Sequence, residues 1–222
     1  MLYVIGTPIG NLNDITLRAL EALKSADVIA AEDTRHSLNL LRHFDIRKPL
    51  VSYHQHNEAM RTQELSERLS VGENVALITD AGMPGLSDPG VRLIRACIER
   101  SLPYTIIPGA SAILTALVGS GFSLERFCFL GFLPVKSGGR ARELRAAAER
   151  TETSVFFESP YRINKTLAAC AEIMPPDRQL CVARELTKKF EEFRRGTAAE
   201  LLAHYEARPA KGEITLVIAG TG

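Results

Sequence analysis

Residues 74–90 read "NVALITDAGMPGLSDPG", an apolar run followed by a loop of three glycines, two prolines and two aspartates. The run is typical of a buried strand, because it is short and rich in aliphatic side chains. A plain turn from a strand into a helix needs far fewer glycines and prolines than this loop contains. The loop is therefore expected to contact a ligand as well as to connect two elements of the fold.

Apolar runs of the same kind recur along the first half of the chain and alternate with helical patterns. Strands are predicted at 2–7, 27–33, 49–56, 74–80 and 104–109. Asp14 is expected to cap the helix after the first strand, and another helix is expected over about 90–101. Strands separated by helices of this length favour βαβ units and a mostly parallel sheet.

The pattern changes near residue 120, where the sequence "GSGFSLERF" is rich in glycine and serine. Further strands are predicted at 126–134, 153–159, 179–187, 189–197 and 213–220, with helices at about 139–150, 161–173 and 197–206. The strands at 179–187 and 189–197 are too close for a helical crossover, so an antiparallel pair is expected. The predicted fold class is α/β. An N-terminal domain at 1–115 holds a parallel sheet, and a C-terminal domain at 116–222 holds a mixed sheet.

The composition is that of an ordinary globular protein, with 222 residues, 45% of them hydrophobic, and a net charge of +1. This charge gives no overall attraction to nucleic acid or membranes. The four cysteines form no CxxC pair, which indicates small core residues in a reducing compartment and no disulfide or zinc framework. No basic leader opens the sequence and no apolar run approaches the ~20 residues that span a bilayer. A cytoplasmic protein with no membrane partner is therefore predicted.

Five loops rich in Gly, Pro, Asp and Ser follow the five predicted strands of the first domain. They are "GTPIGN" (6–11), "EDTRHS" (32–37), "HQHNE" (54–58), the loop at 80–90 and "PGASA" (108–112). Ligands bind beyond the carboxyl ends of parallel strands, so these loops together indicate a site at one edge of the sheet. None contains GxxxxGK[ST] or GxGxxG, and their prolines remove N–H donors that a phosphate would use. An uncharged or cationic ligand is therefore favoured.

The loop at 80–90 divides into two parts. Asp88 and Pro89 have the residue types that begin a helix, with an acidic cap followed by proline. That explanation does not cover Asp80, Gly82 and Gly85. Because glycine lets the backbone approach a ligand closely, these three residues are assigned to ligand contact.

Other polar residues of the loops allow a structural as well as a functional interpretation. Glu32 and Asp33 end an apolar strand, where they either cap the next helix or contact a substrate. His54 and His56 would share one face of a strand, since side chains two residues apart point the same way. No third ligand accompanies them, so a polar role is favoured and no metal site is predicted.

Basic residues concentrate in the second half of the chain. Residues 136–195 hold 13 basic and 9 acidic side chains, a net charge of +4, whereas residues 1–135 hold 12 and 14, a net charge of −2. The segment "KSGGRARELRAAAER" (136–150) alone has five basic and two acidic residues. This excess suits a phosphate backbone such as that of RNA, although a solvated helix face explains the composition as well.

Six motifs, taken together and in order, resemble one known family. They are "GTPIGNLNDIT" (6–16), "EDTR" (32–35), "DAGMPGLSDPG" (80–90), "PGASA" (108–112), "FESPYR" (157–162) and "RELTK" (184–188). The resemblance is to the ribosomal small subunit methyltransferase I family, bacterial enzymes of the tetrapyrrole methylase (class III) fold. The loop at 80–90 is the most specific of the six motifs, whereas "PGASA" is shared more widely within the fold.

The resemblance implies a function that uses S-adenosylmethionine (SAM) and no metal. It implies 2′-O-methylation of a cytidine in 16S rRNA at the decoding centre of the ribosome. It also implies a homodimer, with the cofactor folded into the cleft between the two domains. Members of the family usually continue past the last strand as a small helical extension. This sequence ends at Gly222, so RNA contacts from such an extension are not assigned here.

The resemblance and the positions of the loops together give the candidate site residues. The implied cofactor contacts are Pro8, Asp80, Gly82, Met83, Leu86, Ser111, Ala112, Phe157, Ala183, Gly212 and Glu213. A ribose hydroxyl is a weak acid that needs a proton acceptor. The candidate acceptors at the strand ends are Glu32, Asp33, His56 and Glu58. The candidate RNA contacts are Arg35, Lys136, Arg140, Arg142 and Arg145.

Two other functions remain open. One is methyl transfer to a tetrapyrrole carbon, on a uroporphyrinogen or precorrin, by an enzyme of the same fold. The other is a non-catalytic protein that binds the cofactor or RNA. The basic excess at 136–195 and the particular loop at 80–90 favour RNA over a tetrapyrrole. The polar residues clustered at five strand ends favour a catalyst over a binding protein.

Overall fold

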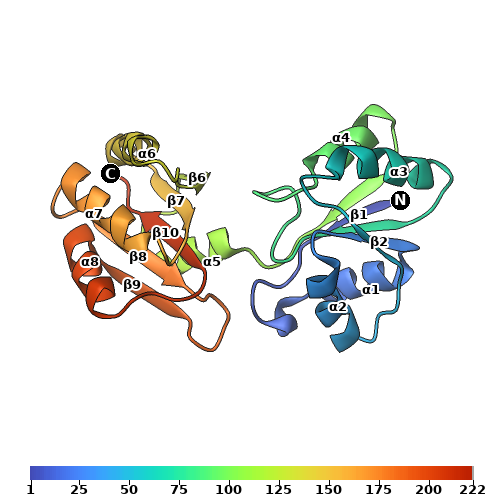
Figure 1. Cartoon of the computed structure of the whole chain (residues 1–222), viewed down its shortest axis with the longest axis horizontal. Coiled ribbons are helices and arrows are strands. Elements are labelled where there is room, and N and C mark those ends of the chain that lie inside the picture. Colours follow the sequence, from blue (N-terminus) through green and yellow to red (C-terminus); the bar gives the residue numbers. More distant parts are fainter. Residues whose placement is uncertain (222) are drawn as a thin grey trace. The chain divides into compact units, whose positions relative to one another are not determined.

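The computed structural model describes residues 1–221 and divides the chain into two compact units (Figure 1). Unit 1 comprises Met1–Ser111, and unit 2 begins at Ala112. Each unit is built around its own five-stranded sheet. The division falls at the start of helix α5 (Ala112–Ser120), whereas the boundary drawn from the sequence, between residues 115 and 116, lies inside this helix.

Unit 1 is a parallel sheet covered by helices. Its elements are β1 (Leu2–Ile5), the 3-10 helix η1 (Leu12–Asp14), α1 (Leu17–Ser25), β2 (Val28–Ala31), α2 (Thr34–His43), β3 (Leu50–Ser52), α3 (Glu58–Ser70), β4 (Val75–Ile78), α4 (Val91–Glu99) and β5 (Tyr104–Ile107). The strand order is β3-β2-β4-β1-β5, and every neighbouring pair is parallel. The predicted parallel sheet is confirmed, with each strand shorter than its apolar run suggested.

The helices of unit 1 cover both faces of its sheet (Figure 1). On one face, Leu23 of α1 packs in the same buried cluster as Ile5 of β1. On the other face, Leu93 of α4 packs with Leu77 of β4. The neighbouring strands β1 and β4 therefore lead into helices on opposite faces. In parallel sheets, ligands bind beyond the carboxyl ends of such a pair, so the functional site is sought there.

Unit 2 is a mixed sheet. Its elements are α5 (Ala112–Ser120), β6 (Phe127–Phe132), α6 (Ser137–Glu149), β7 (Thr153–Glu158), α7 (Ile163–Ile173), β8 (Gln179–Arg184), β9 (Glu192–Thr197), α8 (Ala198–Ala207) and β10 (Ile214–Ile218). The strand order is β6-β7-β10-β8-β9, with β6 and β7 parallel and the other pairs antiparallel. The predicted antiparallel pair is confirmed, and so is the α/β fold class.

The two faces of the second sheet are covered unequally. Helices α6, α7 and α8 pack on one face (Figure 1), where Leu144, Leu167 and Leu201 form one buried cluster with Phe156 of β7. Helix α5 contacts β8, β9 and β10.

Across the described part of the chain, none of the helices has the length and apolar character needed to cross a bilayer.

Two helix starts differ from the prediction. Thr16, not Asp14, caps α1, because its hydroxyl accepts a hydrogen bond from the Ala19 N–H at 3.1 Å while Asp14 lies in η1. Helix α4 begins after Gly90, whose φ of +148° sets the entry of the chain into the helix. Asp88 therefore lies outside the capping position, and its carboxylate serves another purpose.

Candidate active site

The carboxyl ends of β1 and β5 meet at two glycines. The Gly6 N–H donates a hydrogen bond to the Ile107 carbonyl at 3.0 Å. A Cβ atom on Gly109 would lie 2.6 Å from the Gly6 carbonyl oxygen, and one on Gly6 would lie 2.6 Å from the Met83 sulfur. Since real Cβ atoms do not approach other atoms so closely, both positions need glycine. Three loops of the predicted site are thus packed together, and glycines make this possible.

The loop after β4 is tied to the loop after β1 by an isolated bridge. The Thr7 N–H donates to the Gly82 carbonyl at 2.9 Å, and the Gly82 N–H donates to the Thr7 carbonyl at 3.1 Å. The Thr7 hydroxyl also donates to the Thr79 carbonyl at 3.1 Å. Gly82 has a φ of +79°, a left-handed conformation that favours glycine. Backbone conformation therefore accounts for Gly82, without a ligand in close approach.

The rest of this loop is held in shape by its own backbone. The Gly85 N–H donates to the Pro89 carbonyl at 3.1 Å, and the Leu86 N–H donates to the Met83 carbonyl at 3.3 Å. Leu86 is 42% exposed, whereas Met83 is half-buried. The loop is thus a preformed wall that presents Leu86 outward.

Four carboxylates gather where β2 and β4 end. We call them the acidic edge; they are Glu32, Asp33, Asp80 and Asp88. The Thr79 hydroxyl donates to Glu32 Oε2 at 2.6 Å, and Asp88 interacts with the same hydroxyl. The Asp33 N–H donates to Asp80 Oδ1 at 3.2 Å. Residues from two neighbouring strands therefore form one cluster of negative charge.

The members of the acidic edge differ in acidity. Hydrogen bonds from the side chain and backbone of Arg35 lower the pKa of Asp33 to about 2. Asp33 Oδ1 also caps α2, so the structural interpretation of this residue holds. Burial, followed by the charge of Glu32, raises the pKa of Asp88 to about 6 from 3.8. Burial also raises the pKa of Asp80. Carboxylates set apart in this way can play different roles in proton transfer.

Asp88→Asn is expected to stabilise unit 1 at neutral pH. Because the pKa of Asp88 is about 6 in the folded chain and 3.8 in the reference state, the folded protein binds more protons between these values. The contribution of Asp88 to the free energy of unfolding is therefore fully present below pH 4 and is lost as the pH rises through 6. The substitution should remove this loss, about 1 kcal/mol after discounting for solvent screening of a half-buried group. Urea unfolding at pH 4 and pH 7.5 measures it, and an equal effect at both values would contradict the assignment.

The residues after β3 lie in a turn and not on a strand face. β3 ends at Ser52, so the expectation that His54 and His56 share a strand face is wrong. Their rings still meet edge to face, with centroids 5.9 Å apart, and His56 is exposed. Asn57 shapes the turn, because its side-chain oxygen accepts the His54 N–H at 2.9 Å. Glu58 Oε1 accepts the Gly90 N–H at 3.2 Å, which ties this turn to the start of α4.

Of the candidate cofactor residues in unit 1, Asp80, Met83 and Ser111 are half-buried and Leu86 is exposed. Pro8 and Gly82 are buried. The structure therefore brings the loops after β1, β4 and β5 together, but it leaves mainly the loop after β4 and the segment at Ser111 accessible.

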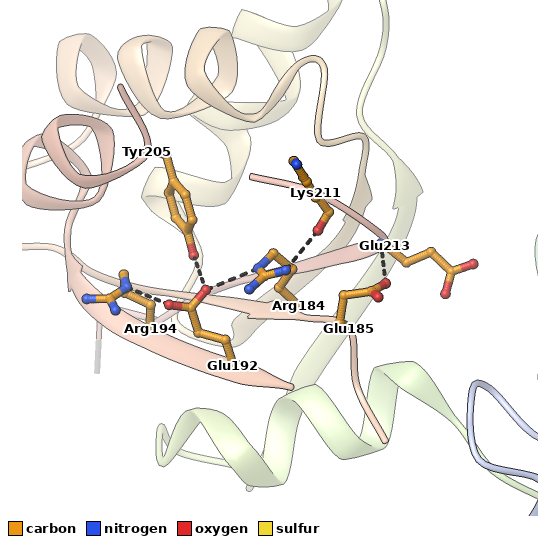
Figure 2. A network of polar contacts seen from close by, with 7 residues as sticks. All are labelled: Arg184, Glu185, Glu192, Arg194, Tyr205, Lys211 and Glu213. Atoms are coloured by element: carbon orange, nitrogen blue, oxygen red, sulfur yellow. Dashed lines mark hydrogen bonds and ion pairs between the residues drawn. The ribbon is translucent and has the colours of Figure 1, made fainter. Parts of the chain in front are cut away.

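The candidate cofactor residues of unit 2 lie on two strands, at the start of a helix and in a turn. Phe157 on β7 is half-buried, and its ring centroid lies 5.0 Å from that of Phe129 and 5.3 Å from that of Phe132. Ala183 is buried in β8, and Ala112 begins α5. The remaining two candidates are adjacent in the turn before β10. Gly212 has a φ of +81°, and the Glu213 N–H donates to Glu185 Oε1 at 3.0 Å (Figure 2).

Two sequence motifs of unit 2 have structural explanations. In "FESPYR", the fully buried Glu158 carboxylate pairs with Arg162 at 2.6 Å and accepts the Thr166 hydroxyl at 2.6 Å. In "RELTK", Lys188 Nζ binds Glu185 Oε1 at 3.0 Å across a turn that holds Glu185 at a φ of +51°. These contacts fix the ends of β7 and β8.

The candidate RNA residues fall into two separate places. Lys136, Arg140, Arg142 and Arg145 lie at the start and along the first turns of α6, where Arg142 is 79% exposed beside Glu143. Arg35 belongs to unit 1, where it is 89% exposed and pairs with Asp33 at 3.0 Å.

Sequence reasoning missed two participants in the site, Thr79 and the carboxylate of Asp88. The sequence signal that could have identified Thr79 is its position directly after the apolar run that forms β4. Among residues 1–221, no group of three or more His, Cys, Asp or Glu side chains is arranged to hold a metal ion.

Sequence comparison identifies close relatives. The profile of the tetrapyrrole (corrin/porphyrin) methylases matches residues 1–202. The protein named ribosomal RNA small subunit methyltransferase I of Synechocystis sp. is 48% identical over 220 residues, which cover 99% of this chain and 79% of that protein. The protein of the same name from Thermotoga maritima is 44% identical over 219 residues, which cover 99% of this chain and 98% of that protein.

Structural comparison finds the same fold in more distant proteins. The methyltransferase CobJ superposes with a TM-score of 0.72 at 20% identity, over 99% of this chain and 94% of that one. The uroporphyrin-III-C-methyltransferase of Thermus thermophilus superposes with a TM-score of 0.67 at 22% identity, over 98% of this chain and 93% of that one. At such low identity these likenesses concern the fold alone.

Proposed function

Because the chain belongs to the tetrapyrrole methylase family, and within it to the ribosomal RNA small subunit methyltransferase I family, we propose that it transfers a methyl group from SAM to 16S rRNA. The observation that carries this proposal is 48% identity over 99% of the chain to a protein of that name. We further propose that the acceptor is the 2′-hydroxyl of a cytidine at the decoding centre, and that the enzyme works as a cytoplasmic homodimer.

The residues of the site fit SAM, which carries a positive sulfonium and an ammonium group. The acidic edge supplies negative charge beside the loop at 80–90, and that loop offers the half-buried Asp80 and the exposed Leu86. In unit 2, Phe157 offers a half-buried aromatic surface and Gly212 and Glu213 an exposed turn. When bound, SAM supplies an electrophilic methyl group. The preformed loop orients it, and orientation alone contributes several kcal/mol to such a displacement.

A proton acceptor near the ribose completes the chemistry. Asp33 is a weak base, because Arg35 holds its pKa at about 2. Glu58 is occupied by the Gly90 N–H and by the Tyr53 hydroxyl, each at 3.2 Å. Glu32 Oε2 accepts one hydrogen bond, from the Thr79 hydroxyl, against the two on Glu58, so Glu32 and the exposed His56 are the better acceptors. Asp88, with a pKa of about 6, is a further acceptor of suitable strength.

Turnover is expected to fall about 10²-fold or more in the variant that lacks the acceptor. Glu32→Gln, His56→Ala and Asp88→Asn are compared with Asp33→Asn and Glu58→Gln, using methyl transfer to 30S subunits and, separately, SAM affinity. Loss of the acceptor should lower turnover far more than it lowers SAM affinity, whereas loss of a carboxylate that only attracts the cofactor should lower mainly SAM affinity. If all five variants kept near wild-type turnover, the assignment of a proton acceptor to this edge would be abandoned.

RNA binding is assigned to Arg35 and to the basic residues of α6. An exposed helix with Arg142 and Arg145 on its surface can neutralise phosphates next to a splayed-out nucleotide.

The alternative is methyl transfer to a tetrapyrrole carbon, which the family name and the fold of the distant structures allow. Incubating the protein with SAM and either 30S subunits or uroporphyrinogen III separates the two. Transfer to the subunits alone is expected. Transfer to the tetrapyrrole alone would replace the proposal, and tight SAM binding with no transfer to either would indicate a non-catalytic binding protein.

A further inference from the structure

Unit 2 contains a charged pocket of about 450 Å³ that the proposed chemistry does not use. It is lined by the end of β8, the start of β9, the end of α8 and the segment at 208–211. Its basic side chains are Arg184, Arg194, Arg208 and Lys211, and its acidic side chains are Glu185 and Glu192. Four positive and two negative charges leave a net charge of +2 around the pocket.

The acidic side chains of the pocket are already engaged (Figure 2). Glu192 Oε1 accepts from Arg194 Nε at 2.9 Å, and its Oε2 accepts from Arg184 Nε at 3.1 Å and from the Tyr205 hydroxyl at 3.3 Å. Burial would raise the pKa of Glu192, but the hydrogen bonds from Arg194 and Arg184 outweigh it and lower the pKa. Glu192 is therefore ionised and holds both guanidinium groups in place.

Glu185 is also unable to neutralise the remaining charge. Its Oε1 accepts from Lys188 Nζ at 3.0 Å and from the Glu213 N–H at 3.0 Å. Arg184 is also engaged, since its Nη1 donates to the Lys211 carbonyl at 3.0 Å (Figure 2). Within residues 1–221, the side chains of Arg208 and Lys211 form no ion pair, whereas Arg194 pairs with Glu192 through its Nε.

The floor of the pocket is rigid. Tyr205 is 1% exposed, and α8 begins with a capping box in which Thr197 and Glu200 satisfy each other's backbone. Antiparallel pairing of β8 with β9 fixes the opposite wall. Arg194 is thus presented from a paired strand, whereas Arg208 and Lys211 lie in the exposed segment that follows α8.

The pocket also contains an exposed aromatic side chain. Phe190 lines the pocket and is 65% exposed, in the connection between β8 and β9. Lys189 Nζ lies 5.6 Å from the centroid of this ring. An exposed ring beside unpaired cations is the combination that binds single-stranded RNA, because the ring stacks on a base while the cations hold the phosphate. An acidic peptide would leave the ring without a partner.

We propose that this pocket binds one nucleotide of single-stranded substrate RNA, with its phosphate on Arg194, Arg208 and Lys211 and its base on Phe190. The proposal rests on the proposed function in that the RNA is the methylated one. It adds a contact that none of the sequence motifs suggested, and this contact lies apart from the basic residues of α6.

The test measures binding of 30S subunits at several salt concentrations. Arg208→Gln and Lys211→Gln are compared with Arg126→Gln, an exposed residue next to β6, at the opposite edge of the same sheet. Each pocket variant should lose about threefold to tenfold in affinity, and the slope of log affinity against log salt should fall by about one, while SAM affinity stays unchanged. Phe190→Ala should weaken binding to 30S subunits, whereas Phe190→Tyr, which keeps an aromatic ring, should bind them like the wild type.

Three results would overturn the proposal, and they differ in what else they affect. If the wild type methylates 30S subunits and the pocket variants bind like Arg126→Gln, the pocket has no role in RNA binding and the proposed function stands. If the wild type neither binds nor methylates the subunits, both proposals fail. Loss of SAM affinity in the pocket variants would also contradict the assignment, since it would indicate a wider structural defect.

Discussion

Arg162→Met is expected to destabilise unit 2 by about 3–5 kcal/mol. Its partner Glu158 is fully buried, with 0% of its side chain exposed, and the ion pair between them is 2.6 Å long. Arg162 Nη1 also donates to the Leu133 carbonyl at 3.1 Å, which joins α7 to the end of β6. Removing the guanidinium leaves a buried carboxylate with only the Thr166 hydroxyl and the Ser159 N–H as donors. Removing one partner of a buried ion pair costs more stability than replacing both partners with apolar residues.

The double variant Glu158→Gln/Arg162→Met separates this explanation from a simple loss of packing. It removes the buried charge together with its partner, so a large part of the lost stability should return. Lys165→Met, an exposed change on the same helix, is the matched control. The chain has no tryptophan, so unfolding in urea is followed by circular dichroism and hydrogen exchange over α7. If Arg162→Met were no less stable than Lys165→Met, the buried pair would not hold unit 2 together.

Gly109→Ala is expected to destabilise unit 1 by about 2–3 kcal/mol and to weaken SAM binding about tenfold or more. The added Cβ would lie 2.6 Å from the Gly6 carbonyl oxygen and 2.8 Å from the Gly6 carbonyl carbon, and both are backbone atoms that no rotamer change can move. The loops after β1 and β5 must therefore separate. Because Met83 also contacts Gly6, the displacement reaches the loop at 80–90.

Gly138→Ala is the control for this experiment. Gly138 lies in α6, where an added Cβ has nothing within 4 Å, so alanine should stabilise the helix by about 0.5–1 kcal/mol. Calorimetric titration with SAM and thermal unfolding measure both variants. Unchanged SAM affinity in Gly109→Ala would contradict the view that the loops after β1 and β5 belong to the cofactor site.

The sheet of unit 1 could be predicted because each of its strands is an apolar run between helical patterns. The antiparallel pair β8–β9 could be predicted from the short interval between its runs. The contact between Gly6 and Gly109 could not, because it joins loops about a hundred residues apart in sequence and only the close approach of their backbones reveals it.

The site shows the same division between local and tertiary information. The capping role of Asp33 is local, and the sequence offered it as one of two interpretations. Asp88 was misinterpreted because the following proline is typical of a helix start, whereas the conformation of Gly90 places the start two residues later. The link from Glu32 to Thr79 crosses from β2 to β4, so it depends on a strand order that the sequence does not state.

The most direct measurement maps the methyl group. The wild-type protein is incubated with methyl-labelled SAM and 30S subunits that lack the modification, and the 16S rRNA is digested to nucleosides. The account predicts that the label appears in RNA as a single 2′-O-methylcytidine. Label on a base, or no label in the RNA while uroporphyrinogen III accepts the methyl group, would contradict it.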